Sequence, residues 1–199
     1  PAPCNLPPMA ATDPLPEPDR LEGDPHPRET RALFGHAEAG FLQAFTSGRL
    51  HHAWMLTGPK GVGKATLAWR LSRFLLATPA DDGGMFAAPP PTTLDIDPAN
   101  PIARRLLQLA EPRHFLLRRA PNEKETALSQ VISVDEVRKM KSFFALTAAD
   151  GGRRTAIIDA VDDMNPAAAN ALLKLLEEPP PNVTLFLIAH QPARLLPTI

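Results

Sequence analysis

The chain has 199 residues, of which 44% are hydrophobic, and a formal net charge of −1. This length suits one α/β domain with extra segments, and the balanced charge gives no global field that would attract nucleic acid or an anionic membrane. The single cysteine, Cys4, excludes internal disulfides and cysteine-based zinc sites and fits a reducing compartment, so we expect a cytoplasmic protein. No apolar run approaches the roughly 20 residues of a membrane span, and the first residues do not have the pattern of a signal peptide.

The first part of the chain is expected to be an arm followed by a helix. Residues 1–28 hold nine of the 24 prolines and few large apolar side chains, which predicts a flexible proline-rich arm. A helix is expected from Thr30 or His36 to Ser47, because Gly48 is well suited to end it.

A phosphate-binding pattern follows. A strand expected at 52–57 leads into a glycine-rich turn and then a helix expected at 63–77, the order of the G-x-x-x-x-G-K-[ST] motif. Backbone N–H groups of such a loop point inward, and the helix N-terminus adds partial positive charge for an anion. Lys64 would reach the β- and γ-phosphates. The residues predicted to contact phosphate are Gly58, Pro59, Lys60, Gly61, Val62, Gly63, Lys64, Ala65 and Thr66.

The loop departs from the motif at its eighth position. A Ser or Thr hydroxyl there would bind Mg²⁺, but the chain has Ala65, and Thr66 comes one residue late. One residue along a helix is a rotation of about 100°, so we expect Thr66 to point elsewhere. The pattern predicts a loop that accepts phosphate and holds its metal poorly. A glycine-rich turn that binds nothing is the alternative.

The middle of the chain is interpreted as an insertion and two short elements. Residues 78–100 are rich in Pro, Ala, Asp and Gly, which indicates a loop or linker. Asn100 before Pro101 is typical of a helix start, and this helix is expected to bury apolar side chains as far as Leu109. A strand is expected at 114–119.

A further helix is expected after residue 132. Ser133 and Glu136 match a capping box, which predicts where it begins. The basic residues expected on its solvated face are Arg138, Lys139 and Lys141. A nucleic-acid patch is the alternative for these residues. His114 has no potential ligand at suitable spacing, so no metal site is expected there.

The last third of the chain alternates strand and helix. Strands are expected at 153–159 (RRTAIID) and 183–189 (VTLFLIA), and Asn165 with Pro166 opens a helix between them. This alternation predicts an α/β fold in which an open parallel sheet carries helices on both faces.

The second part of the expected site follows the strand at 153–159. A P-loop ATPase needs an acid there that orders Mg²⁺ and a base for the attacking water. Asp159 supplies the acid, or is only a strand-end capping carboxylate, and the next residue is Ala160. Asp162 and Asp163 would have to fold back to substitute. A positioned base contributes about 10²–10⁴-fold in rate, so we expect a site that binds nucleotide without catalysing hydrolysis.

Three stretches together resemble one family. GPKGVGKAT, IIDAVDDMNPAAANALLKLLEEPP and TLFLIAHQPARLLPTI are similar to the bacterial clamp-loader subunits of the AAA+ class, and most of all to the delta-prime subunits of DNA polymerase III. The resemblance covers about Thr30–Ile199 and weakens across 78–122. It implies an AAA+ P-loop domain at 29–199 and a role in DNA replication. The implied partners are the motor ATPase subunits and delta, and indirectly the sliding clamp and primer–template DNA.

Departures from the family pattern carry further expectations. Many members have a four-cysteine zinc module that this chain lacks, so no zinc is expected. Ala65 and Ala160 stand where active clamp-loader ATPases have a hydroxyl and a glutamate, which implies a stator-like scaffold with weak ATP or ADP binding. The family's sensor residue falls at Ala189 or His190. The family continues past Ile199 with an arginine finger and with lid and collar domains, so the chain is expected to be a fragment.

Two other functions remain open at this point. One is an active motor-type ATPase of a clamp loader. The other is a small-molecule phosphotransferase that shares only the phosphate loop.

Overall fold

The computed structural model describes residues 35–79, 89–121, 128–145 and 152–192. The arm predicted at 1–28, the central part of the 78–100 insertion and residues 193–199 lie outside these ranges.

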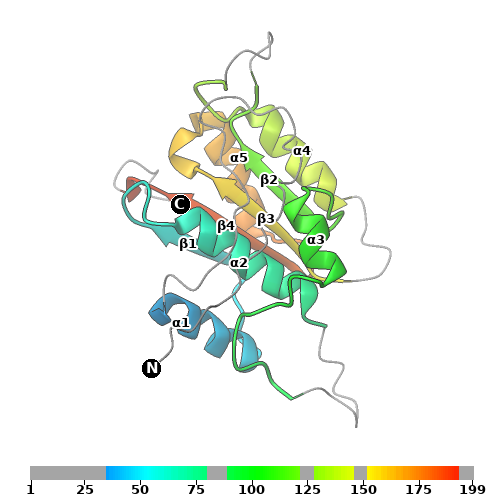
Figure 1. The fold of residues 1–199 in the computed structure, drawn as a ribbon. Helices are drawn as coiled ribbons and strands as arrows, with labels where there is room; N and C mark the ends of the chain where they lie inside the picture. Colours follow the sequence, from blue (N-terminus) through cyan, green and yellow to red (C-terminus); the bar gives the residue numbers. More distant parts are fainter. Residues whose placement is uncertain (1–34, 80–88, 122–127, 146–151, 193–199) are drawn as a thin grey trace, which may run out of the picture.

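Four parallel strands form one sheet in the order β1-β4-β3-β2 (Figure 1). Their bounds are Ala53–Thr57 for β1, His114–Arg118 for β2, Arg154–Asp159 for β3 and Val183–Ala189 for β4. All seven residues of β4 are buried, because this strand lies between β1 and β3 and both of its faces are covered.

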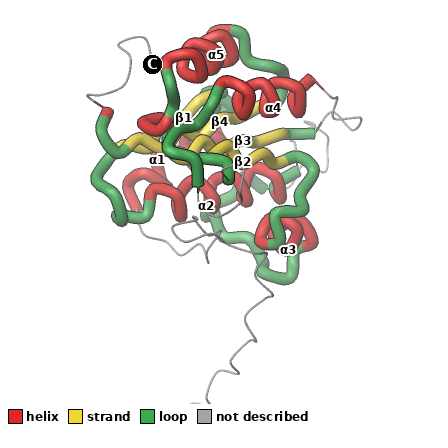
Figure 2. The backbone as a smooth tube through the Cα atoms, turned by 90° about the horizontal axis from the view of Figure 1, so that it is seen from above, coloured by secondary structure: helices red, strands yellow, loops and turns green. Residues whose placement is uncertain are grey.

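Helices cover both faces of the sheet (Figure 2). One layer holds α1 (Gly35–Thr46), α2 (Lys64–Ala77) and α3 (Pro101–Leu107), and the opposite layer holds α4 (Val134–Ala145) and α5 (Pro166–Glu177). A short 3₁₀ helix, η1 (Val161–Asp163), lies between β3 and α5. The predicted α/β class, a parallel sheet with helices on both faces, is confirmed.

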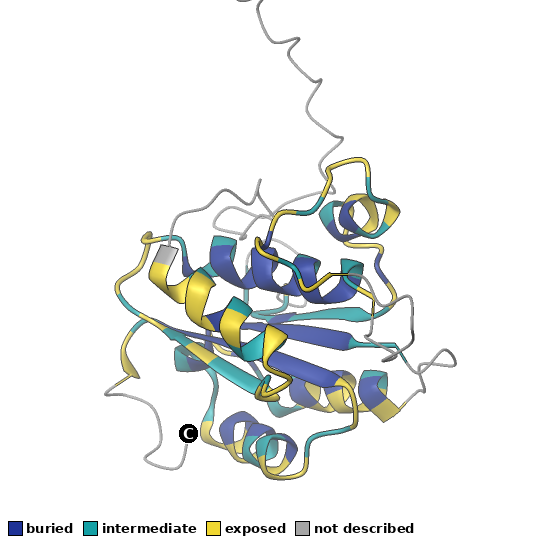
Figure 3. Cartoon of the chain, turned by 90° about the horizontal axis from the view of Figure 1, so that it is seen from below, coloured by how far each residue is buried: buried dark blue, intermediate teal, exposed yellow. Residues whose placement is uncertain are grey.

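The core is divided by the sheet into two clusters, as the strand alternation requires. Ile157 of β3 joins the cluster under α1, α2 and α3, whereas the next residue, Ile158, joins the cluster under α4 and α5. Both side chains are 0% exposed. Figure 3 shows the two central strands buried and the outer strands mostly of intermediate burial, between helices whose outer faces are exposed. The helices packed on both faces of β3 and β4 determine where the carboxyl ends of these strands lie.

The predicted helix ends are confirmed where polar or glycine residues mark them. Asn165 Oδ1 accepts a hydrogen bond from the Ala168 N–H at 2.8 Å, and Asn100 Oδ1 accepts one from the Ile102 N–H at 2.8 Å. Gly48, with φ of 69°, follows α1. The N–H groups of residues 48 and 49 bond the carbonyls of residues 45 and 44, which is the Schellman arrangement.

The helix predicted to continue to Leu109 ends earlier. Helix α3 stops at Leu107, and Leu109 is 42% exposed with φ of 54°. Its N–H bonds the Leu106 carbonyl and the Ala110 N–H bonds the Arg105 carbonyl. This is again a Schellman end, formed here without the glycine that would have revealed it in the sequence.

Two surface expectations can be compared with the structure. Part of the presumed linker packs on the domain: Leu94 is 2% exposed, and Asp95 pairs with the buried Arg70 of α2 at 2.8 Å.

On α4 the basic residues are exposed. Arg138 forms an ion pair with Asp135 and Lys139 forms one with Glu136, in each case across one turn of the helix. These pairs support the solvated-face interpretation of the basic residues.

Candidate phosphate-binding site

The carboxyl ends of the four strands meet at one edge of the sheet, and the candidate site lies there. Arg118 at the end of β2 is the register partner of Asp159 at the end of β3, and Asp159 is paired in turn with Ile188 of β4. The phosphate loop follows the end of β1. Open parallel sheets bind ligands outside these ends.

The loop has the backbone that its glycines predict. Gly61 and Gly63 have φ of 82° and 94°, in the left-handed region that favours glycine. Gly63 is the N-cap of α2, so the first turn of this helix follows the loop directly. The N–H groups of a first helical turn have no partner within their helix and suit an anion.

Lys64 is held by the loop itself. Its Nζ donates hydrogen bonds to the carbonyls of Gly58 and Pro59, each at 2.6 Å, and the residue is 5% exposed. Burial lowers the pKa of Lys64, while the negative charges of Asp159 and Asp162 act in the opposite direction. The amine therefore lies against the first two residues of the loop.

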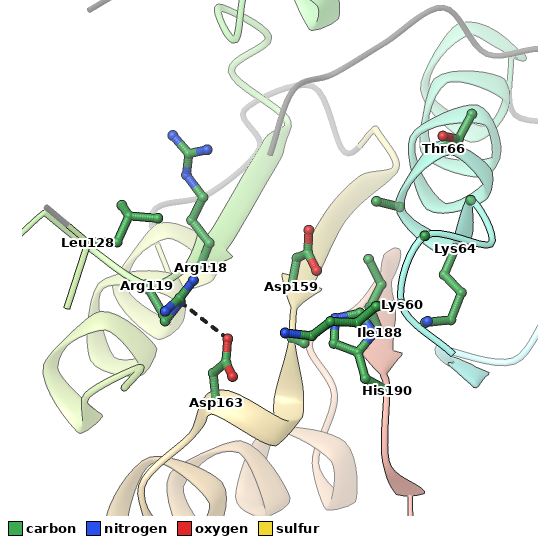
Figure 4. Close-up of a pocket in the computed structure, with 14 residues that line it drawn as sticks. Lys60, Lys64, Thr66, Arg118, Arg119, Leu128, Asp159, Asp163, Ile188 and His190 are labelled. Carbon is green, nitrogen blue, oxygen red and sulfur yellow. Dashed lines mark ion pairs between the residues drawn. The ribbon is translucent and has the colours of Figure 1, made fainter. Parts of the chain in front are cut away.

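A cavity of about 600 Å³ opens between the loop and the strand ends (Figure 4). Seven of the ten residues predicted for the site line it: Lys60, Gly61, Gly63, Lys64, Ala65, Thr66 and Asp159. The other three are not in its lining. Gly58 and Pro59 instead hold the Lys64 amine through their carbonyls, and Val62 is 45% exposed.

The position that should bind Mg²⁺ has no hydroxyl. Ala65 faces the cavity with a methyl group only. Thr66 also lines the cavity, one position farther along α2, and lies apart from the carboxylates in Figure 4. The rotation expected between positions 65 and 66 thus keeps the Thr66 hydroxyl apart from Asp159, the acid with which it would have to bind a metal ion.

Asp159 is the predicted acid, and it lies between the loop and the end of β2 (Figure 4). Burial raises the pKa of its carboxyl most strongly. The neighbouring His190, Lys64 and Arg118 act to lower it, and Asp163 acts to raise it. Its neighbour Ala160 is 2% exposed and carries no group that could activate water.

The next two acids have different roles. Asp162 accepts the backbone N–H groups of His190 and Gln191, the latter at 2.9 Å, so it fixes the chain after β4. Asp163, the last residue of η1, does fold back: it lines the cavity with Arg119, whose Nε lies 3.3 Å from its carboxylate.

The two residues considered for the sensor position lie in different surroundings. Ala189 is 0% exposed and belongs to the core, whereas His190 lines the cavity. Burial, and secondarily the charge of Lys64, lower the pKa of the His190 ring. A polar contact from the end of β4 into the cavity therefore comes from His190.

Sequence reasoning missed the arginines of the cavity. Arg118 is the last residue of β2 and Arg119 follows it, and both line the cavity opposite the loop. The sequence did offer one signal. Both arginines come at the carboxyl end of an expected strand, and ligands of parallel sheets bind at the edge where such ends, including Asp159, meet. Nothing in the local pattern, however, showed which strands were neighbours.

Two further properties concern the described residues as a whole. No helix among them is long and apolar enough to cross a membrane. Among the same residues, no group of three or more His, Cys, Asp or Glu side chains is placed to hold a metal ion.

Comparisons with known proteins agree with this geometry. The family model described as "DNA polymerase III, delta subunit" matches residues 36–199. The chain is 39% identical to the DNA polymerase III subunit delta-prime of Pseudomonas aeruginosa over 150 residues, 74% of this chain and 40% of that protein. It is 30% identical to the delta-prime subunit of Escherichia coli over 159 residues, 79% and 42% of the two chains.

More distant similarities extend to a second kind of subunit. The DNA polymerase III subunit gamma/tau of Mycobacterium tuberculosis is 29% identical over 167 residues, 82% of this chain and 25% of that protein. The crystal structure of a DNA polymerase III gamma subunit-related protein from Thermotoga maritima matches with a TM-score of 0.53 at 18% identity, over 81% and 42% of the two chains. This last match supports the α/β fold. The chain spans 40% and 42% of the length of the two delta-prime relatives.

Proposed function

Because the chain belongs to the DNA polymerase III delta-subunit family, we propose that it is the nucleotide-binding domain of a delta-prime-type clamp-loader subunit in DNA replication. In this proposal the domain acts as a scaffold and binds ATP or ADP without hydrolysing it. The delta-prime relatives support the subunit type. The proposed partners are the motor ATPase subunits and delta, and indirectly the sliding clamp and primer–template DNA. The proposed compartment is the cytoplasm.

One observation carries the non-hydrolysing part of this proposal. The cavity combines a glycine loop and Lys64 with Ala65 and Ala160 at the positions for the metal hydroxyl and the base. The backbone cradle fits phosphate, whereas the side chains around it do not fit Mg²⁺. A bound nucleotide would supply the phosphates, and the loop N–H groups and Lys64 would hold them.

The second candidate is an active motor ATPase, which the gamma/tau relatives favour. Both missing groups argue against it, because loss of the base alone removes about 10²–10⁴-fold in rate. A small-molecule phosphotransferase has no such support, since none of the relatives described above is one.

Purified protein is expected to release phosphate from ATP at no more than about 10⁻² s⁻¹, since ordinary enzymes turn over at about 1–10³ s⁻¹ and the base is absent. Steady-state phosphate release with Mg²⁺ is the measurement, and Lys64→Ala is the control for contaminating ATPases. The two proteins should give equal rates. Turnover near 1 s⁻¹ that disappears in Lys64→Ala would favour the motor ATPase instead.

A further inference from the structure

The cavity carries an excess of positive charge that the phosphate loop does not explain. Four cationic side chains line it, two from the loop and α2 (Lys60 and Lys64) and two from the end of β2 (Arg118 and Arg119), against two carboxylates. In Figure 4 Lys64 lies on one side of Asp159 and the two arginines lie on the other, while the Lys60 side chain extends past Asp159 toward Asp163. An anion that spans the cavity would therefore meet cations at both ends.

The two carboxylates are poor ligands for a divalent cation. Burial raises the pKa of Asp159, which disfavours its charged form. Asp163 already pairs with Arg119. Mg²⁺ requires near-octahedral oxygen ligands, while Ala65 provides none and the nearby lysines and arginines repel a cation.

Arg119 is suited to receive an anion while it stays paired. A guanidinium has five N–H donors in a planar fork, and Asp163 contacts it through Nε. Arginine binds phosphate oxygens by two parallel hydrogen bonds. Arg118, the register partner of Asp159, also lines the cavity.

We propose that this cavity binds the phosphate chain of a nucleoside di- or triphosphate as the metal-free anion, with Arg118 and Arg119 in place of the metal ion. The proposal rests on the nucleotide binding proposed above and deepens it, because it names the form of the ligand and the residues that select it. The phosphates extend from the loop N–H groups across Asp159 to the end of β2. Mg²⁺ competes with the protein for the nucleotide and does not assist it.

The experiment is calorimetric titration of the protein with ADP, once in EDTA and once in excess MgCl₂. We expect binding in EDTA to be at least as tight as in MgCl₂. Arg119→Gln and Arg118→Gln should each weaken ADP binding in EDTA about tenfold or more, the loss typical of a charge-assisted hydrogen bond. The matched control is Arg138→Gln, which removes the same charge from an exposed site on α4 and should leave ADP binding unchanged. Thermal unfolding of each variant verifies that it is folded.

A fourth variant, Lys64→Ala, separates the two proposals. If wild-type protein binds ADP only with Mg²⁺, and Lys64→Ala abolishes that binding while the β2 arginine variants do not weaken it, the metal-free inference is wrong and nucleotide binding stands. If ADP does not bind in either buffer, both are wrong. If Arg138→Gln weakens binding as much as the β2 variants do, the effect is one of net charge and the assignment to Arg118 and Arg119 fails.

Discussion

Replacing Phe41 with alanine is expected to lower the free energy of unfolding by about 3–5 kcal/mol, the range for truncation of a buried phenylalanine. Phe41 is 0% exposed. Its ring lies 4.9 Å from Trp54 of β1 and 6.0 Å from Phe186 of β4, measured between centroids. It also makes an edge contact with Phe74 of α2. The substitution removes the side chain through which α1 contacts three other elements.

Urea unfolding of wild type and variant at pH 7.5 measures this loss. Gln43→Ala, exposed on the same helix, is the control and should change stability by no more than about 0.5 kcal/mol. A loss below about 1 kcal/mol in Phe41→Ala would mean that the site relaxes and that α1 does not depend on this ring.

Acidification from pH 7.5 to 5 is expected to destabilise the protein through His114 by about 2 kcal/mol. The ring Nδ1 lies 2.9 Å from Thr155 Oγ1 and 3.1 Å from Ser72 Oγ, between α2 and the sheet. Burial lowers the pKa of His114 to about 3, against about 6.5 in an unfolded chain. The unfolded state therefore binds more protons between these values, and stability falls as pH decreases from 6.5 toward 3.

The measurement compares urea unfolding at the two pH values for wild type, His114→Gln and His51→Gln. Glutamine keeps hydrogen-bonding groups near Ser72 and Thr155 but does not titrate, so the pH dependence of His114→Gln should be smaller by about 2 kcal/mol. His51 is exposed, and its variant should keep the wild-type dependence. If all three proteins lose the same stability on acidification, His114 is not the group responsible.

The fold could be predicted from the sequence because its signals are local and strong. Three kinds of signal each determine the structure of a short segment, whatever the rest of the chain does. They are the apolar runs of β3 and β4, the Asn-Pro pairs at 100 and 165, and the glycine loop. Leu109 shows the limit of this reasoning. A leucine gives no warning of a left-handed backbone, and only the carbonyls of the preceding turn determine where α3 ends.

The site could be predicted only in part, because half of it depends on contacts between distant segments. Asp163 reaches the cavity through η1, and its carbonyl accepts a hydrogen bond from the Ile132 N–H at 2.7 Å. Ile132 belongs to the segment before α4, so no local pattern relates it to residue 163. Arg118 and Arg119 enter the cavity because β2 pairs with β3, an arrangement of strands that their own sequence does not state.

The two hydrogen bonds that hold the Lys64 amine against Gly58 and Pro59 also make phosphate binding an exchange. The two carbonyls occupy two of the three N–H donors of the ammonium group, so an incoming phosphate competes with them for all but one donor. Only protein molecules in which the Lys64 amine has left these carbonyls bind phosphate with the full intrinsic affinity. The apparent affinity is therefore the intrinsic affinity multiplied by the fraction of such molecules. Binding of phosphate by Lys64 therefore includes the free-energy cost of loosening its hydrogen bonds to Gly58 and Pro59.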